Sequence, residues 1–212
     1  MNKVPERVFE RLPWSQFTTQ DLAVLFPGSE DRRYGLVKRA LASGEIIHIR
    51  RGLYCLAPKY QKKSVNLYAL AQHVHGPSYI SLESALSWHG WIPEAVHAVT
   101  SVSFKKSREF KTPLGIFSYD RVPQRVFYSE VERLADASGN VFLMARPLKA
   151  LADYVYVRNR NWAGIDAMAS DLRIEPEELD QITGGMLGAL SGNYSDSRVM
   201  RFLEGLRKDL NL

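Results

Sequence analysis

The chain between residues 18 and 56 reads TTQDLAVLFPGSEDRRYGLVKRALASGEIIHIRRGLYCL. Its first four residues, Thr18-Thr19-Gln20-Asp21, have the form of a capping box, and apolar residues follow at the spacing of a helix. Pro27-Gly28 ends this short helix, and Ser29 can cap a second one that finishes at Gly44. The stretch therefore predicts two helices separated by one tight turn.

A β-hairpin is predicted directly after the second helix. Residues 45–49 contain three isoleucines, and residues 53–56 are apolar with one tyrosine, so both runs are strand-like. Arg50-Arg51-Gly52 joins the two runs, and its glycine permits a tight turn. A short helix is also expected upstream, over residues 4–12. The resulting order of elements is that of a winged helix-turn-helix.

The basic excess of the chain lies entirely in this first part. Residues 1–63 hold twelve Lys or Arg and six Asp or Glu, a net charge of +6, whereas residues 64–212 hold sixteen and seventeen, a net charge of −1. Because neutralising phosphates is the main source of nonspecific affinity for DNA, this asymmetry suggests a DNA-binding module followed by a near-neutral one. We therefore expect one domain over residues 1–63 and another over residues 64–212.

The second predicted helix carries a basic face opposite its apolar stripe. Arg32 and Arg39 lie seven residues apart on that face, within reach of base edges or phosphates in a major groove. Arg33 falls on the apolar side, and a phosphate contact is the role we expect for it. The candidate contacts to duplex DNA are Ser29, Arg32, Arg33, Tyr34, Lys38, Arg39 and, at the hairpin tip, Arg50 and Arg51. The alternative is a solvated basic face without a ligand.

The remainder of the chain is predicted to form a larger, mixed α+β domain. Helices are expected over residues 64–75, 81–90 with Ser81 as its cap, 147–157, 162–172 and 176–190, and in a last helix capped by Ser195 or Ser197. Strand-like runs cover residues 95–104, 114–119, 125–128 and 141–144. The whole chain is therefore expected to be an α+β protein with an N-terminal winged helix.

Three segments resemble the AbiEi family of antitoxins from type IV toxin-antitoxin systems. They are GEIIHIRRGLY at residues 44–54, YISLESALSWHG at residues 79–90 and RPLKALAD at residues 146–153. The third is similar to the family's Pro-Glu-Lys-Ala-Leu-x-Asp stretch, with Leu148 in place of the glutamate. The resemblance spans residues 15–160, and the C-terminal helices follow the family only in order and length.

This resemblance implies a function for each half of the chain. It implies a bacterial transcriptional autorepressor that binds an inverted-repeat operator in double-stranded DNA. It also implies that the C-terminal domain counteracts a nucleotidyltransferase-like toxin without forming a stable complex with it. Lys149 and Asp153, which match the third family motif, are the candidate residues for the antitoxin function.

Motifs for catalysis or for metal and cofactor binding are scarce. No phosphate-binding loop of the Gly-x-x-x-x-Gly-Lys type and no Gly-x-Ser-x-Gly elbow occurs. His73 and His75 are two residues apart on a predicted helix, so their side chains would point about 160° away from each other. We therefore expect no catalytic residue, no metal site and no cofactor.

Two alternative functions remain at this stage. Pro93-Glu94, followed by Glu109-Phe110-Lys111, loosely fits the acid, then acid-x-lysine pattern of metal-dependent nucleases. The second part continues the basic run Lys105-Lys106-Ser107-Arg108, and together they have the mixed charge that is typical of a solvated loop. The other alternative is a ligand-responsive transcriptional regulator without an antitoxin role.

The composition also bears on where the protein works. No apolar stretch approaches the roughly 20 residues that a membrane helix needs. The opening residues, Met1 to Glu6, are charged and lack the apolar core of a signal peptide. The single cysteine, Cys55, lies between leucines, as is typical of a small buried residue, and fits a reducing compartment. We therefore expect a cytoplasmic protein with no membrane partner.

Overall fold

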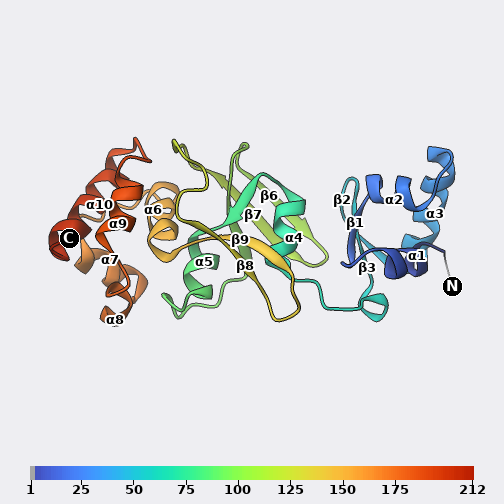
Figure 1. Ribbon diagram of the computed structural model, residues 1–212, viewed down its shortest axis with the longest axis horizontal. Helices are drawn as coiled ribbons and strands as arrows, with labels where there is room; N and C mark the ends of the chain where they lie inside the picture. Colours follow the sequence, from blue (N-terminus) through green and yellow to red (C-terminus); the bar gives the residue numbers. More distant parts are fainter. Residues whose placement is uncertain (1–2) are drawn as a thin grey trace.

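The computed structural model describes residues 3–212 and is a mixed α+β structure. Figure 1 shows an elongated molecule with the N-terminal helices at one end and the C-terminal helices at the other. A six-stranded sheet lies between them, and a smaller three-stranded sheet accompanies the N-terminal helices. The expected fold class is therefore confirmed.

The N-terminal elements have the arrangement of a winged helix. They are α1 (Lys3–Arg11), β1 (Gln16–Thr18), α2 (Thr19–Leu25), α3 (Glu30–Ala42), β2 (Ile46–Arg50) and β3 (Leu53–Leu56). The strands form an antiparallel sheet in the order β1-β3-β2, in which β2 and β3 are the predicted hairpin. We refer to residues 3–56 as the winged-helix segment.

Local hydrogen bonds explain where these helices begin and end. The Thr18 hydroxyl accepts a hydrogen bond from the Asp21 backbone N–H, and the Asp21 carboxylate accepts one in return from the Thr18 backbone N–H, at 2.7 Å. The Ser29 hydroxyl caps α3 by accepting from the Arg32 backbone N–H. Gly44 follows α3 with a φ of +66°, a conformation that glycine adopts without strain. The predicted capping residues are thus confirmed.

A small apolar core holds this segment together. It is formed by Val4, Val8, Phe17, Leu22, Phe26, Val37, Ala40, Ile46 and Leu56. These side chains come from all three helices and all three strands. The core therefore sets how α3 sits on the sheet, with Val37 and Ala40 inward and the basic side chains outward.

The larger segment, residues 67–209, is connected to the first by a short 3-10 helix at Pro58–Tyr60. Its helices are α4 (Leu67–Val74), α5 (Leu82–Trp88), α6 (Pro147–Val157), α7 (Ile165–Leu172), α8 (Pro176–Leu179), α9 (Gly184–Ser191) and α10 (Ser197–Asp209). Its strands are β4 (Ser78–Ile80), β5 (Ala98–Ser103), β6 (Arg108–Thr112), β7 (Gly115–Arg121), β8 (Val131–Ala135) and β9 (Val141–Ala145). The sheet order is β6-β7-β5-β4-β9-β8, with β5 parallel to β7 and β4 parallel to β9.

Several strand predictions were wrong in this larger segment. Residues 125–128 are not a strand, because the backbone N–H groups of Arg125 and Val126 donate to the Asn193 carbonyl and side-chain oxygens instead of to a neighbouring strand. The strand β8 begins later, at Val131. The strand β6 was expected to be part of a loop; as an edge strand it carries the charged side chains that such strands often have.

The helix boundaries also differ from the prediction in several places. The helix expected over residues 176–190 is two helices, α8 and α9, and the Thr183 hydroxyl caps the second. The cap of α10 is Asp196, whose carboxylate accepts two backbone N–H groups, and is neither of the predicted serines. The helix α4 begins after the cap Asn66, and α7 begins at Ile165. By contrast, α6 has the predicted bounds.

None of the helices among residues 3–212 has the length and apolar content that crossing a lipid bilayer requires.

The two hydrophobic cores meet at the hairpin. Leu53 and Cys55 of β3 point into the core of the larger segment, whereas Tyr54 and Leu56 pack in the small core. Because alternate residues of a strand face opposite sides, β3 is buried on both faces and joins the two cores.

We predict that Thr18→Ala lowers the free energy of unfolding by about 0.5–2 kcal/mol, because it removes the cap of α2. Urea denaturation monitored by circular dichroism measures this change. Thr19→Ala is the matched control, because Thr19 is exposed within α2 and caps no helix. Equal stabilities for the two variants would contradict the capping role of Thr18.

Candidate nucleic-acid interface

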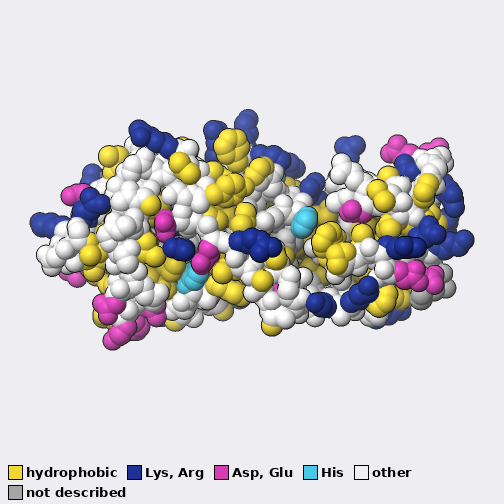
Figure 2. Space-filling model, in the orientation of Figure 1, with side chains coloured by type: hydrophobic (Ala, Val, Ile, Leu, Met, Phe, Trp, Pro, Cys, Tyr) yellow, Lys and Arg dark blue, Asp and Glu magenta, His cyan; other side chains and the backbone are white. Residues whose placement is uncertain are grey.

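The exposed face of α3 carries half of the side chains that the sequence nominates for DNA contact. Arg32, Tyr34, Lys38 and Arg39 are all exposed, and Tyr34 has 69% of its surface open to solvent. Figure 2 shows Lys and Arg side chains gathered at the end of the molecule where α3 lies, with acidic side chains between them. This face is available to a large, flat or grooved partner.

Ser29 and Arg33 have structural tasks beside this face. The Ser29 hydroxyl caps α3, and the Arg33 guanidinium donates to the Gly28 carbonyl oxygen at 2.6 Å and to the Phe26 carbonyl oxygen at 3.5 Å. Arg33 is half-buried as a result. The expected phosphate contact of Arg33 therefore competes with hydrogen bonds that hold the turn between α2 and α3.

The two arginines of the hairpin have different environments. Arg51 is exposed at the tip, as expected for a wing that contacts DNA. Arg50 is half-buried, and its guanidinium donates to the His73 carbonyl oxygen of α4 at 3.0 Å. The expectation that both arginines project from the tip was therefore wrong for Arg50, because a backbone oxygen of the larger segment holds its side chain.

Lys149 and Asp153 lie far from any surface. Both side chains have 0% of their surface exposed, and the Lys149 Nζ atom lies 2.7 Å from the Asp153 Oδ1 atom. The same ammonium group donates to the Tyr194 hydroxyl at 2.6 Å and to the Gln124 side-chain oxygen at 2.8 Å. All three N–H donors of the lysine are therefore paired.

The Asp153 carboxylate is just as completely bound. Its Oδ1 atom also accepts a hydrogen bond from the Tyr194 hydroxyl at 2.8 Å. Its Oδ2 atom accepts from the Ser81 hydroxyl at 2.8 Å and the Tyr79 hydroxyl at 3.0 Å. Ser81 begins α5, but its hydroxyl binds Asp153 and does not cap the helix as predicted. We call Lys149, Asp153, Tyr194, Tyr79, Ser81 and Gln124 the buried network.

Burial and charge together control protonation in this network. Burial lowers the pKa of Lys149, and the neighbouring Asp153 carboxylate opposes that change. Burial, and then the Asp153 charge, raise the pKa values of Tyr79 and Tyr194 well above the usual range. Both tyrosines therefore remain protonated donors, and Lys149 and Asp153 have no surface with which to touch a partner protein.

Sequence reasoning nominated only two members of this network. Lys149 and Asp153 were nominated by their match to the third family segment, and the structure shows that they lie four residues apart on the predominantly apolar helix α6. The other members come from β4, from the residue that links β4 to α5, from residue 124 and from the segment before α10. Tyr79 and Ser81 open the second family segment, and Ser81 was expected to be a helix cap, but no local pattern indicates that these residues contact the ion pair, because that contact exists only in the folded chain.

The candidate nuclease residues do not form a shared site. Glu94 pairs with Arg173, whereas Glu109 lies 3.8 Å from Lys111 on the edge strand β6. His73 is exposed, and His75 faces the carbonyl oxygen of Lys106. Across residues 3–212, no group of three or more His, Cys, Asp or Glu side chains has the arrangement of a metal site.

The single cysteine matches its prediction. Cys55 has 0% of its surface exposed, and burial raises the pKa of its thiol to about 12. A thiol with that pKa remains protonated at neutral pH and is a poor nucleophile. Cys55 therefore serves as a core residue of β3.

Neither a protein-family model nor a curated protein matches this chain. The similarity to AbiEi antitoxins thus rests on the three sequence segments alone. The function has to be argued from the chain's own surfaces and charges.

We predict that Lys149→Met destabilises the protein by about 3–5 kcal/mol, because it leaves the Asp153 carboxylate buried without its cation. Urea denaturation measures the loss. The double variant Lys149→Met/Asp153→Leu removes both charges and is expected to recover part of it. A single variant as stable as the original protein would rule out the ion pair as a structural necessity.

Proposed function

We propose that this protein is a DNA-binding transcriptional repressor that uses α3 as its recognition helix and the β2–β3 hairpin as its wing. The exposed basic face of α3 on a winged-helix scaffold is the observation that carries this proposal. The +6 charge of residues 1–63 supports it, because phosphate neutralisation drives association with duplex DNA. The operator is expected upstream of the protein's own gene.

In this proposal the residues divide between base reading and phosphate binding. Arg39 and Arg32 lie on the exposed face of α3, where a recognition helix contacts base edges. Arg51 lies at the wing tip and would contact the sugar-phosphate backbone or an adjacent minor groove. Arg50 contributes indirectly, since its hydrogen bond to His73 links the wing to α4.

The antitoxin role is the second part of the proposal, and it rests on the resemblance to the AbiEi family. We propose that the larger segment antagonises a nucleotidyltransferase-like toxin encoded by a neighbouring gene. Lys149 and Asp153 would act in this function by maintaining the fold, because both are fully buried. The surface that opposes the toxin would be formed by other residues of the larger segment.

We predict that Arg39→Ala weakens binding to the operator by about 1–3 kcal/mol and relaxes sequence preference, because it removes a contact to a base edge. Fluorescence anisotropy with DNA from upstream of the gene, and with a scrambled duplex, measures both effects. Lys59→Ala is the charge-matched control, because Lys59 is an exposed lysine outside α3 and the hairpin. Equal affinities for all three proteins would refute the docking of α3.

We predict that Arg51→Ala weakens binding to all duplexes alike and reduces the slope of log K against log salt concentration by about 1, because it removes one phosphate contact. A salt titration of the anisotropy assay measures that slope. A sequence-dependent loss with an unchanged slope would argue against a phosphate contact by the wing.

We predict that the full chain carrying Arg39→Ala and Arg51→Ala still rescues cells from the toxin when the toxin is expressed from an independent promoter. Repression cannot explain rescue in that arrangement, so the neutralising activity would belong to the larger segment. Colony counts with and without toxin induction provide the measurement. If only the chain with intact DNA binding rescues, the antitoxin part of the proposal fails.

A further inference from the structure

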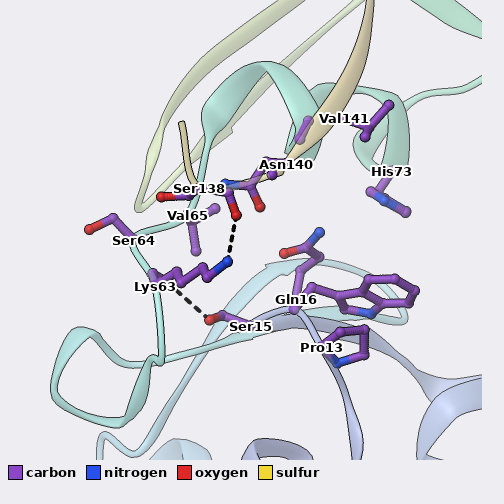
Figure 3. A pocket seen from close by; sticks show the side chains of 13 residues that line it. Pro13, Ser15, Gln16, Lys63, Ser64, Val65, His73, Ser138, Asn140 and Val141 are labelled. Carbon is purple, nitrogen blue, oxygen red and sulfur yellow. Dashed lines mark hydrogen bonds between the residues drawn. The ribbon is translucent and has the colours of Figure 1, made fainter. Parts of the chain in front are cut away.

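A cleft of about 430 Å³ lies between the winged-helix segment and the larger segment (Figure 3). One wall comes from residues 13–16, and the other comes from residues 63–65 of the connection, from α4 and from the turn before β9. Its volume is in the range of about 300–1,000 Å³ that is typical of small-molecule sites. None of the DNA-contact candidates lines it.

Gln16 is the first indication of what the cleft could bind. Its side chain is only 9% exposed, and Figure 3 shows its amide directed into the cleft. Its amide atoms are not among the buried side-chain atoms of the described residues that lack a hydrogen bond, so they face the solvent in the cleft. A ligand with a neighbouring donor and acceptor would satisfy both of these polar atoms.

Trp14 is the second indication. It lines the cleft and leaves 50% of its surface exposed, although an indole is usually buried. A ring with an open face at the edge of a cleft can stack on a planar aromatic ligand. The amide of Gln16 and the indole face of Trp14 within one cleft together favour a ligand with a flat heteroaromatic ring.

The charge of the cleft favours an anionic group on that ring. The ionisable side chains that line it are Lys63 and His73, and no acidic residue of the described chain is among its lining residues. Lys63 spans the cleft: its Nζ atom donates to the Ser138 carbonyl oxygen at 2.6 Å, and its own carbonyl accepts from the Ser15 hydroxyl. Two donors of the ammonium group remain for a ligand.

One acidic group lies close to this cation. Asp136 does not line the cleft, and its carboxylate accepts hydrogen bonds from Asn140, Asn66 and the Ser138 backbone; these bonds lower its pKa to about 2, so it stays ionised at neutral pH. Burial lowers the pKa of His73, which therefore offers a neutral imidazole at neutral pH. Lys63 is thus the cation that an anionic ligand would meet.

We propose that this cleft binds a purine nucleotide of the adenine type. Gln16 would pair with the adjacent donor and acceptor of the adenine edge, as glutamine does when it contacts adenine in DNA. Trp14 would stack on the ring, and Lys63 would bind the phosphate. The three side chains that make these contacts come from both sides of the cleft.

The position of the cleft also connects this site with regulation. Because its walls belong to both segments, a ligand that bridges them favours one orientation of the winged helix relative to the six-stranded sheet. Ligand and operator affinities would then be coupled reciprocally. This consequence rests on the proposed DNA-binding function, whereas the ligand site itself does not.

Isothermal titration calorimetry of the full chain with AMP, without DNA, tests the site. We expect saturable binding of AMP, weaker binding of adenosine and still weaker binding of inorganic phosphate, because neither of the latter two makes all three contacts. No binding at millimolar AMP, or phosphate binding as tight as AMP binding, would overturn the proposal.

Two variants and one matched control locate the ligand. Gln16→Leu and Lys63→Ala are each expected to weaken AMP binding about tenfold or more, since each removes polar contacts worth at least about 1.4 kcal/mol. Lys62→Ala loses the same charge from the neighbouring residue, whose ammonium lies over the Phe9 ring, and is expected to bind AMP normally. Lys63 is exposed, so Lys63→Ala is informative even if Gln16→Leu fails to fold. Equal affinities for Lys63→Ala and Lys62→Ala would overturn the assignment.

The coupling is tested by repeating the operator titration with saturating AMP. A change in operator affinity of about fivefold or more is expected from the usual size of allosteric coupling, and it should disappear in Lys63→Ala. AMP binding without such a change would overturn the coupling but leave the site intact. Failure of the operator to bind in any condition would count against the proposed function and not against the ligand site.

Discussion

The paired charges of Lys149 and Asp153 constrain how the interior of the larger segment assembles. An ion pair without solvent access is tolerated only when every donor and acceptor is satisfied, because desolvation of each charge is costly. Here the lysine has three partners and the carboxylate has four hydrogen-bond donors. The pair therefore requires β4, α6 and the segment before α10 to assemble together.

Asn193 and Tyr194 extend this constraint into the C-terminal part of the chain. Tyr194 is hydrogen-bonded to the ion pair, and Asn193 accepts hydrogen bonds from the backbone N–H groups of Arg125 and Val126. Those backbone groups are consequently unavailable to a neighbouring strand. The buried network thus explains why residues 125–128, with a good strand composition, remain outside the sheet.

The hairpin β2–β3 has two roles that compete for the same residues. Its strands are packed between the small and the large apolar core, and Arg50 donates to α4. Arg51 alone of the two tip arginines is left exposed for a partner. The wing is therefore anchored to the rest of the molecule through the two cores and through Arg50.

The sequence alone determined the winged helix, its capping residues, the basic face of α3 and the bounds of α6. These features depend on capping boxes, helical periodicity and charge, which involve residues close together in the chain. The tertiary structure alone decided the partners of Lys149 and Asp153, the inward turn of Arg50 and the cleft beside Gln16. Each of these depends on groups from distant parts of the sequence. Their contacts follow from how the two cores pack, and no local sequence pattern predicts that packing.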